Sequence, residues 1–555
     1  MTNRRLLNVL GLMVVLLAIT PALTTSSAGR WTQATNMSDW QAALEPHWMR
    51  ISDDGTQVVY WIAFDLVGPK GAIHARVRPP GGSWGQVEDI TGWMTGTWNL
   101  NFWKVVVGPD GTAWAVWAIY DPGQPAVSRF KMKAAQRLPD GTWQSEDWTG
   151  WLAQVRFVDL SVGPDGDLVA AWVACDTTST TLSDGPCRVN ARRRPAGATA
   201  WGPTQQLNSL PGPAGVDEAY ALVGPAGLAV VVWDQVNSGA TAQWGVMANA
   251  FNPSTGSWDI SQTPVSGFVE PRNVGNWLAQ PVMDPGGTVV AAWTAKTPPA
   301  LLQDAQYSST RAASTGTWSL PAQIAAPNNA NSFGEPRLAV GQNGAVVAAW
   351  EWENASSQYA IFANARDPGG TWSGELQVST SLVSSVSLRD LDVWPDGTAM
   401  VLWEEKDTTR PADVDEALWW SARTPSSTWG SGGDGQLWGW GKAVSGAALE
   451  LSSDGTGTVA WGVEDANQPT NQQGAVLAAH WPSAGPWDTP TTILEGYKGA
   501  YVWYEGLAAG PGGRSVGAAF LVWRHVVAPT PGVAIFYSGW QRKALYLPIV
   551  MRQSP

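Results

Sequence analysis

Short apolar runs separated by turn residues recur along this chain, and one stretch shows the pattern clearly. The runs Val158–Val162 and Leu168–Ala174 flank Gly163-Pro164-Asp165-Gly166, a tight-turn sequence in which proline presets φ and glycine accepts positive φ. Arg188–Arg192 and Trp201–Leu207 complete a predicted set of four strands. The second run is apolar on both faces, as expected of a strand buried on both sides. No long 3.6-residue apolar periodicity occurs, so we predict almost no helix.

The same unit recurs about every 57 residues along the chain. A turn glycine is followed, six residues later, by a tryptophan at the end of the second apolar run. These pairs are Gly55/Trp61, Gly111/Trp117, Gly166/Trp172, Gly227/Trp233, Gly287/Trp293, Gly344/Trp350, Gly397/Trp403 and Gly455/Trp461, with a looser ninth copy ending at Trp523. A second tryptophan marks the predicted fourth strand of each unit: Trp84, Trp143, Trp201, Trp258, Trp318, Trp372, Trp429, Trp487 and Trp540. Two landmarks with one period indicate a propeller, a solenoid or an array.

Four antiparallel strands in each unit predict an all-β fold, a single β-propeller over residues 29–540. Wide indole rings would fill the wedge between neighbouring sheets. Arg30-Trp31-Thr32-Gln33 resembles an isolated fourth strand, and Trp31 precedes Trp84 by 53 residues, within the range of the period. We therefore predict nine four-stranded blades, with this N-terminal strand closing the ring. An eight-bladed ring with a divergent last unit is the alternative.

The start of the chain has the pattern of an export signal. Arg4 and Arg5 precede the apolar run Leu6–Ile19, and small residues follow, which predicts a signal peptide over residues 1–28. The alternative is an uncleaved anchor. The run is shorter than the ~20 residues of a membrane span, and no other stretch is long enough, so we expect no membrane span in the mature chain. Residues 541–555 form a predicted C-terminal tail around Leu545–Val550, with an irregular edge strand as the alternative.

The two cysteines of the chain, Cys175 and Cys187, bracket a polar loop between two predicted strands of one unit. If those strands form a hairpin, the thiols lie close together across the ladder. We therefore predict a disulfide rather than two free thiols, in keeping with a secreted or cell-surface protein.

Composition and charge narrow the classes of function. Charged residues are 14% of the 555 residues, well below the usual ~25%, whereas tryptophan occurs 37 times. Lys and Arg number 33 against 46 Asp and Glu, and the net charge of −13 argues against a nucleic-acid partner. The histidines, His47, His74, His480 and His525, share no metal-ligand spacing, and no phosphate loop or Gly-x-Ser-x-Gly motif occurs. We expect no metal, no cofactor and a monomer.

The string of Pro-Asp-Gly, apolar strand, Trp and then Gly-Thr-Trp resembles the repeats of bacterial secreted sialidase-like propellers. The nearest matches to the Asp-boxes of that family are Asp140-Gly141-Thr142-Trp143 and Ser52-Asp53-Asp54-Gly55-Thr56, at a different spacing, and the Phe/Tyr-Arg-Ile-Pro signature is absent. Gly369-Gly370-Thr371-Trp372-Ser373 and Gly81-Gly82-Ser83-Trp84 are similar to the strand that recurs in each blade of Trp-rich propeller lectins. A weaker similarity is to the Trp-docked propellers of quinoprotein dehydrogenases. These resemblances imply carbohydrate binding or glycoside hydrolysis on a propeller.

Alignment of the predicted first strands on their turn glycines shows where the repeat symmetry is broken. The residues six and four before the glycine are mostly apolar, whereas the residue seven before it changes from unit to unit. The candidates for the central channel are Trp48, Lys104, Asp159, Tyr220, Gln280, Arg337 and Asp390 at that position, with Arg50, Asp392 and Glu450 five residues before the glycine. Buried charges need partners or water, so these groups should face the channel or pair with one another as structural groups.

Surplus tryptophans occupy the connections between the fourth strand of one unit and the first strand of the next. They are Trp93, Trp98, Trp103, Trp148, Trp151, Trp438 and Trp440. Such connections line one rim of a propeller, where exposed indole faces could stack on sugar rings or on a partner chain. The alternative is that these side chains plug gaps between blades.

From these features we predict a secreted binding or interaction propeller that holds carbohydrate through its Trp-rich rim. The alternatives are a sialidase-like glycoside hydrolase and a protein–protein scaffold at the cell surface. Sialidases use a tyrosine nucleophile, and other retaining glycosidases place two carboxyl groups ~5–5.5 Å apart. The residues available for such chemistry are Tyr220 with Glu218, or Tyr504 with Glu505, together with Arg50, Arg337 and Arg389. Binding needs only aromatic and polar groups at a rim, which this chain has in excess.

Overall fold

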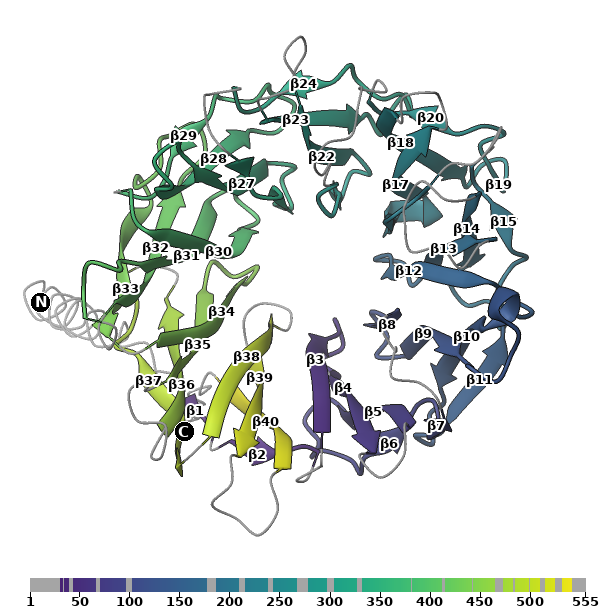
Figure 1. Cartoon of the computed structure of the whole chain (residues 1–555), viewed down its shortest axis with the longest axis horizontal. Helices are drawn as coiled ribbons and strands as arrows, with labels where there is room; N and C mark the ends of the chain where they lie inside the picture. The colour runs from purple at the N-terminus through teal and green to yellow at the C-terminus, as the bar shows by residue number, and fades with distance from the viewer. Residues whose placement is uncertain are drawn as a thin grey trace, which may run out of the picture.

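In the computed structural model, nine antiparallel sheets stand side by side around a ring (Figure 1). The structure describes residues 30–32, 34–38, 43–65, 70–95, 102–176, 186–208, 215–237, 243–266, 278–296, 304–326, 332–380, 382–411, 415–441, 443–464, 473–482, 485–498, 500–509, 515–524 and 532–541. Helix in this part of the chain is limited to two 3-10 turns, η2 (Ala126–Ser128) and η3 (Pro225–Gly227). The predicted all-β propeller of nine blades is confirmed.

Each sheet is one blade, and its strands follow chain order from the centre of the ring outwards, except that the outermost strands of the last blade come from the start of the chain (Figure 1). Blade 1 contains β3 (Ala43–Ile51), β4 (Gln57–Asp65), β5 (Lys70–Arg78) and the outer β6 (Glu88–Asp89) and β7 (Met94–Thr95). Blade 2 contains β8 (Trp103–Val107), β9 (Ala113–Tyr120), β10 (Phe130–Arg137) and β11 (Trp143–Asp147). Blade 3 contains β12 (Gln154–Val162), β13 (Leu168–Cys175), β14 (Cys187–Arg194) and β15 (Gln205–Gln206).

The next three blades have short inner strands. Blade 4 contains β16 (Ala219–Val223), β17 (Ala229–Asn237), β18 (Gln243–Asn252), β19 (Ser257–Trp258) and β20 (Thr263–Pro264). Blade 5 contains β21 (Val282–Met283), β22 (Val289–Lys296), β23 (Asp304–Arg311) and β24 (Ala322–Gln323). Blade 6 contains β25 (Ser332–Phe333) and β26 (Arg337–Val340), which both pair with β27 (Val346–Glu353), then β28 (Tyr359–Arg366) and β29 (Leu376–Gln377).

The last three blades complete the ring. Blade 7 contains β30 (Ser385–Val393), β31 (Ala399–Lys406), β32 (Glu416–Arg423) and β33 (Gly433–Gly441). Blade 8 contains β34 (Ala443–Leu451), β35 (Gly457–Glu464), β36 (Gln473–Trp481) and β37 (Thr491–Lys498). Blade 9 contains β38 (Ala500–Ala509), β39 (Ser515–Arg524) and β40 (Gly532–Gln541), with β1 (Arg30–Trp31) and β2 (Thr35–Asn36) both paired to β40.

The ring is closed at both its inner and its outer side. The inner strands contact one another in an unbroken circle, in the order β3, β8, β12, β16, β21, β26, β30, β34, β38 and back to β3. At the outer side, Trp31 of β1 lies opposite Trp540 of β40 in an antiparallel register, and the purple β2 lies against the yellow β40 in Figure 1. This confirms the predicted N-terminal strand, which covers an edge of β40 that would otherwise be unpaired.

The repeated turns need glycine for a backbone reason. The eight turn glycines have φ between 74° and 89°, a region that side-chain-bearing residues avoid: Gly55, Gly111, Gly166, Gly227, Gly287, Gly344, Gly397 and Gly455. The aspartate before the glycine also stabilises the turn. Its carboxylate accepts the backbone N–H of the threonine two residues later, at 2.8–3.1 Å, in four turns: those of Asp54, Asp110, Asp396 and Asp454. These bonds explain the recurrent Asp-Gly-Thr string.

The tryptophans at the end of the second apolar run fill the wedges between blades. All eight are 0–3% exposed: Trp61, Trp117, Trp172, Trp233, Trp293, Trp350, Trp403 and Trp461. Each belongs to an apolar cluster that it shares with residues of the preceding blade. An indole ring removes ~150–250 Å² from water in such a place. The predicted wedge role is confirmed for this landmark.

An arginine recurs near the end of the third strand and bridges to the preceding blade. In five blades this arginine pairs with the residue two positions after the turn glycine: Arg78, Arg194, Arg311, Arg366 and Arg423. In blade 2, Arg137 directly follows Gln136, the last paired residue of the register. The Arg137 guanidinium donates to Glu88 of blade 1 at 2.6 and 2.7 Å. Arg366 likewise donates to the Thr310 hydroxyl of blade 5. Neighbouring blades are therefore tied by charge-assisted hydrogen bonds as well as by tryptophan.

The ends of the chain lie outside the described residues. The signal peptide over residues 1–28 and the tail around Leu545–Val550 therefore stay predictions. Within the described part, no helix is both long enough and apolar enough to cross a membrane.

The predicted disulfide is present between Cys175 and Cys187. The two residues lie directly opposite each other at the ends of β13 and β14, and both are buried. The disulfide also closes this loop in the unfolded chain and so lowers the conformational entropy of the unfolded state.

We expect replacement of both cysteines by alanine to lower the free energy of unfolding by ~3 kcal/mol. Without the bridge, a loop of this size gains conformational entropy in the unfolded state, and that entropy corresponds to about this free energy. Guanidinium denaturation measures the change. Reductant should lower the stability of the wild type to that of the variant and leave the variant unchanged. Two reactive thiols in the native, unreduced protein would contradict the assignment.

Candidate functional site

A cavity of about 680 Å³ opens beside the inner strands of blades 4 to 7. Its polar lining residues are Tyr220, Gln280, Glu335, Arg337, Glu351 and Asp390. Tyr220, Gln280, Arg337 and Asp390 occupy the same repeat position in four successive blades, seven residues before the turn glycine. The side chains at the repeat position where the sequence symmetry is broken therefore meet, in these four blades, at one cavity.

Two prolines create the room for this cavity. Pro281 and Pro336 line it, and each directly precedes the inner strand of its blade, β21 or β26. Because proline has no N–H to donate to a ladder, the inner strands here are short: β21 has 2 residues and β26 has 4, against 9 in β12 and in β30. The cavity lies beside these two short inner strands.

Three of the predicted channel carboxylates serve the architecture. An inner strand is paired on one side only, so the N–H groups of its other edge need acceptors. Asp159 accepts the N–H of Ala221 in the next blade at 2.9 Å. In the same way Asp390 and Asp392 accept the N–H groups of Leu449 and Leu451 at 2.8 Å. These carboxylates join one blade to the next by accepting backbone N–H groups.

Burial shapes the protonation of these linking carboxylates. Loss of water raises the pKa of Asp159, with Lys104 acting in the opposite direction. Burial likewise raises the pKa of Asp390, and its backbone donor Leu449 opposes the shift. The pKa of Asp392 rises to about 7 for the same reason. Both oxygens of Asp392 accept backbone N–H groups, from Val393 at 2.7 Å and from Leu451 at 2.8 Å, which opposes the shift.

The predicted cations take different roles. Lys104 Nζ lies 3.8 Å from Asp159 Oδ1 and is well exposed. Arg337 donates one N–H to the backbone oxygen of Arg389 at 2.7 Å, and the rest of its exposed guanidinium is available to the cavity. Arg50 is exposed and donates to the backbone oxygen of Met49, away from the cavity.

The remaining channel candidates also lie outside the cavity. Trp48 is half-buried in an aromatic cluster, with its ring centroid 5.1 Å from that of Trp103 and 6.1 Å from that of Tyr60. Glu450 is half-buried on β34 of blade 8. Of the ten channel candidates, four therefore meet in the cavity and six are spread around the ring.

Four acidic residues at or beside the cavity were not found from the sequence as a group. Glu335 and Glu351 line it, and Glu218 accepts the Tyr220 hydroxyl hydrogen at 3.0 Å. Behind them the buried Asp234 accepts the N–H groups of Asp217 and Glu218 at 3.1 and 2.9 Å. The prolines that interrupt two neighbouring first strands were the sequence signal that could have located this place.

Burial raises the pKa values of Glu218, Asp234 and Glu335. Burial raises the pKa of Glu218 to about 7, with the carboxylates of Glu335 and Asp217 adding to the shift. Burial also raises the pKa of Asp234 to about 7. The pKa of Tyr220 rises above its ordinary value because of burial and the nearby Glu218. In the described part of the chain, no three His, Cys, Asp or Glu side chains are grouped as a metal site.

The predicted rim tryptophans differ in exposure. Trp93 is 47% exposed, and its ring lies 5.6 Å from that of His74. Trp151 and Trp440 are half-buried beneath Lys131 and Arg410, at 5.1 and 4.1 Å from the ring centroids.

The other rim tryptophans serve packing where the structure describes them. Trp148 is buried against Trp172 and Trp201, and Trp103 is buried against Trp48. Trp438 is half-buried against Trp461. Trp98 lies outside the described residues. Among the described members of this set, Trp93 offers a ligand the most indole surface.

Comparison with known proteins yields structural likenesses alone. No family model matches the chain, and no curated protein matches it. Polysaccharide lyase Uly1 is 10% identical with a TM-score of 0.40, covering 69% of this chain and 91% of its own. NanB sialidase from Streptococcus pneumoniae, as a K499G mutant, is 10% identical with a TM-score of 0.32, covering 93% and 95%. BP39L lectin from Burkholderia pseudomallei is 12% identical with a TM-score of 0.35, covering 84% and 100%. At such values these names assign no activity to this chain.

The raised pKa of Asp234 predicts a pH effect on stability. The unfolded carboxyl ionises near its ordinary value of 3.8, whereas the folded one keeps its proton until about 7. Stability is therefore lost as pH rises through this window, at ~1.4 kcal/mol for each unit of pKa difference at most. Asp234→Asn cannot ionise and keeps an oxygen for the two N–H groups, so we expect it to exceed the wild type by ~1–2 kcal/mol at pH 8.

Urea denaturation at pH 5 and pH 8 measures this difference. The gain should shrink at pH 5, where the wild-type carboxyl is protonated in the folded state. Asp53→Asn, at an exposed turn position, is the matched control and should change little at either pH. A larger gain at pH 5 than at pH 8 would contradict the assignment.

Proposed function

We propose that this protein is an exported propeller that binds a hydroxyl-rich ligand, the end of a glycan chain, in the cavity of blades 4 to 7. The observation that carries the proposal is the convergence of Tyr220, Gln280, Arg337 and Asp390 on one hollow. These residues occupy one repeat position and are all different, although the rest of their strands is repetitive. At about 680 Å³ the cavity has the size usual for small-molecule sites, ~300–1,000 Å³.

The lining has the donors and acceptors that a polyol needs. Within the described structure, Gln280 and Glu335 form no hydrogen bond, and Arg337 uses one N–H group. A sugar hydroxyl both donates and accepts, so it can satisfy an amide, a carboxylate and a guanidinium together. Tyr220 is held edge-on by Phe157, with ring centroids 5.1 Å apart, and gives the cavity a fixed aromatic wall. Trp93, exposed between the outer strands of blade 1, is proposed as a separate glycan contact.

We expect Arg337→Ala to weaken glycan binding about tenfold, which corresponds to ~1.4 kcal/mol. A glycan array identifies the ligand, and isothermal titration calorimetry with the best binder measures the change. Lys104→Ala is the matched control, because Lys104 is a cation at the same repeat position outside the cavity. Equal weakening by both variants, or no glycan bound by the wild type, would contradict the proposal.

Glycoside hydrolysis is the second candidate, favoured by the Tyr220–Glu218 hydrogen bond at 3.0 Å beside the cavity. A nucleophilic tyrosine needs its proton removed, and the raised pKa of Tyr220 opposes that. The guanidinium of Arg389 is already paired with Glu404. The side chains of Tyr504 and Glu505 lie outside those described. Binding is therefore placed first.

Fluorogenic sialosides and a panel of aryl glycosides separate the two candidates. We expect no turnover, because the phenol of Tyr220 stays protonated beside Glu218. Turnover that disappears in Tyr220→Phe would establish the hydrolase instead. Neither turnover nor glycan binding would leave the protein–protein scaffold as the function to pursue.

A further inference from the structure

A second hollow, of about 410 Å³, lies between blades 7 and 8 and shares no lining residue with the inner cavity. We call it the Trp481 groove. Its walls are the turn after β30, with Asp396 and Thr398, and the turn after β34, with Ser453 and Asp454. Thr424 and Gly432 line it from the β32–β33 connection, and two tryptophans, Trp394 and Trp481, complete it. The groove thus combines aromatic rings with hydroxyl and carboxylate groups.

Trp481 stands where the other blades carry an arginine. It lies opposite Gly457, two residues after the turn glycine of its blade, and the equivalent residue is arginine in blades 1, 3, 5, 6 and 7. Those arginines include Arg366 and Arg423, which bridge to the preceding blade. Blade 8 has therefore replaced a cation that closes the gap between blades with a half-buried indole.

Trp394 breaks the repeat in the facing blade. Four other blades have glycine at this place in the turn, Gly108, Gly163, Gly224 and Gly341, and two have serine, Ser52 and Ser452. The Trp394 indole reaches under the turn of blade 8, where its N–H donates to the Thr456 backbone oxygen at 2.9 Å. The ring is fixed in one orientation by this bond.

Gly457 shows that the two changes belong together. A Cβ at this position would lie 3.0 Å from Leu451 Cδ2 and 3.3 Å from the Trp394 ring, both closer than ordinary contacts, and 3.4 Å from the Trp481 Cβ. The equivalent residues in other blades all carry a side chain: Gln57, Ala113, Leu168, Ala229, Val289, Val346 and Ala399. Loss of a side chain at Gly457 leaves room for the Trp394 ring, and Trp481 lies opposite Gly457 in the register, so three departures from the repeat meet at one groove.

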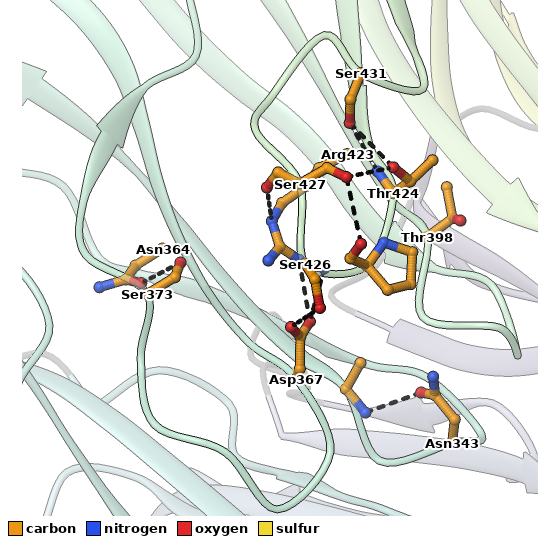
Figure 2. A network of polar contacts seen from close by, with 12 residues as sticks. Asn343, Asn364, Asp367, Ser373, Thr398, Arg423, Thr424, Ser426, Ser427 and Ser431 are labelled. Carbon is orange, nitrogen blue, oxygen red and sulfur yellow. Dashed lines mark hydrogen bonds and ion pairs between the residues drawn. The ribbon is translucent and has the colours of Figure 1, made fainter.

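The side chains around the groove are held in place. Trp481 is contacted edge-to-face by Trp420 and Trp487, with ring centroids 5.0 and 5.4 Å away. Figure 2 shows how the Thr424 wall is braced against blade 6: Arg423 and Ser426 both contact Asp367, at 3.5 and 2.8 Å. A groove that is rigid before binding spends less entropy when a ligand is ordered.

We propose that the Trp481 groove binds the ring of a neutral saccharide, which packs its C–H face on Trp481 and donates hydroxyl hydrogens to Asp396 and Asp454. An indole supplies a flat apolar platform with a polar rim, and carboxylates accept strong hydrogen bonds. No Lys, Arg or His lines the groove among the described residues, and two carboxylates do. Sialic acids, uronic acids and phosphates are therefore repelled. This site goes beyond the inner cavity and does not depend on it.

The test uses the full exported chain and the methyl glycosides of glucose, galactose, mannose, fucose and N-acetylglucosamine at millimolar concentration. Saturation-transfer NMR detects binding, and calorimetry with the strongest binder gives its affinity. We expect Trp481→Arg, which restores the residue of the other blades, to fold normally and to weaken binding by about tenfold or more. Trp481→Phe should keep most of the affinity because it keeps an aromatic platform. Phe251→Ala is the matched control, since Phe251 is the aromatic residue at the same register position of blade 4 and is buried.

The outcomes separate this site from the inner cavity. Binding that survives Arg337→Ala and is lost in Trp481→Arg and in Asp454→Asn supports the groove, whatever the fate of the inner site. Binding that is lost in Arg337→Ala and survives Trp481→Arg would overturn it. A wild type that takes none of the neutral glycosides, or that takes an acidic sugar or a peptide at Trp481 in their place, would overturn it as well.

Discussion

The wedge between neighbouring blades is the constraint on which this molecule depends. Flat sheets arranged around a circle diverge outwards, and the space between them must be filled or the ring collapses. The eight buried tryptophans, each in a cluster shared with the preceding blade, fill it at mid-radius. Towards the centre, Asp159, Asp390 and Asp392 satisfy the free edge of the next inner strand. Further out, arginines such as Arg137 bridge back to the blade before. The residues that recur in each repeat are therefore mainly those that make contacts between blades.

Both candidate sites arise where one of these contacts has been altered. In blades 5 and 6, Pro281 and Pro336 shorten the inner strands, and the cavity with Arg337 and Glu335 lies there. In blade 8, Trp481 stands in place of the bridging arginine, and the groove appears beside it. A repeat protein can in this way gain a site by local substitution, because the remaining blades keep the ring closed.

Acidic chemistry dominates the inner cavity. Glu218 and Asp234 both have a pKa near 7, so their charge changes across the neutral range. A negative charge on either carboxyl would repel Glu335 and favour a hydrogen-bond donor nearby, from Arg337 or from a ligand. A ligand bound in the proposed site would therefore be coupled to the protonation of Glu218.

Much of the fold was determined by the sequence itself. Turn glycines, the Asp-Gly-Thr string and the Cys175–Cys187 pair follow from local spacing, because a hairpin places known offsets opposite each other. The closing strand at Trp31, which pairs with Trp540 at the other end of the chain, follows from the repeat period. The sequence also marked the position of Arg337 as one where symmetry fails. The signal peptide over residues 1–28 is likewise a prediction from the sequence.

Only the tertiary structure decided which of these side chains meet. Asp159 and Asp390 share a repeat position, yet one bonds the next blade and the other also lines a cavity, because proline had shortened the strands beside it. Trp148 and Trp93 both stand in connections, and packing buried the first and left the second exposed. Trp394 and Trp481 are 87 residues apart and meet because two blades are neighbours and their strands are in register. Contacts across the wedge depend on the distance between blades, which no local pattern records.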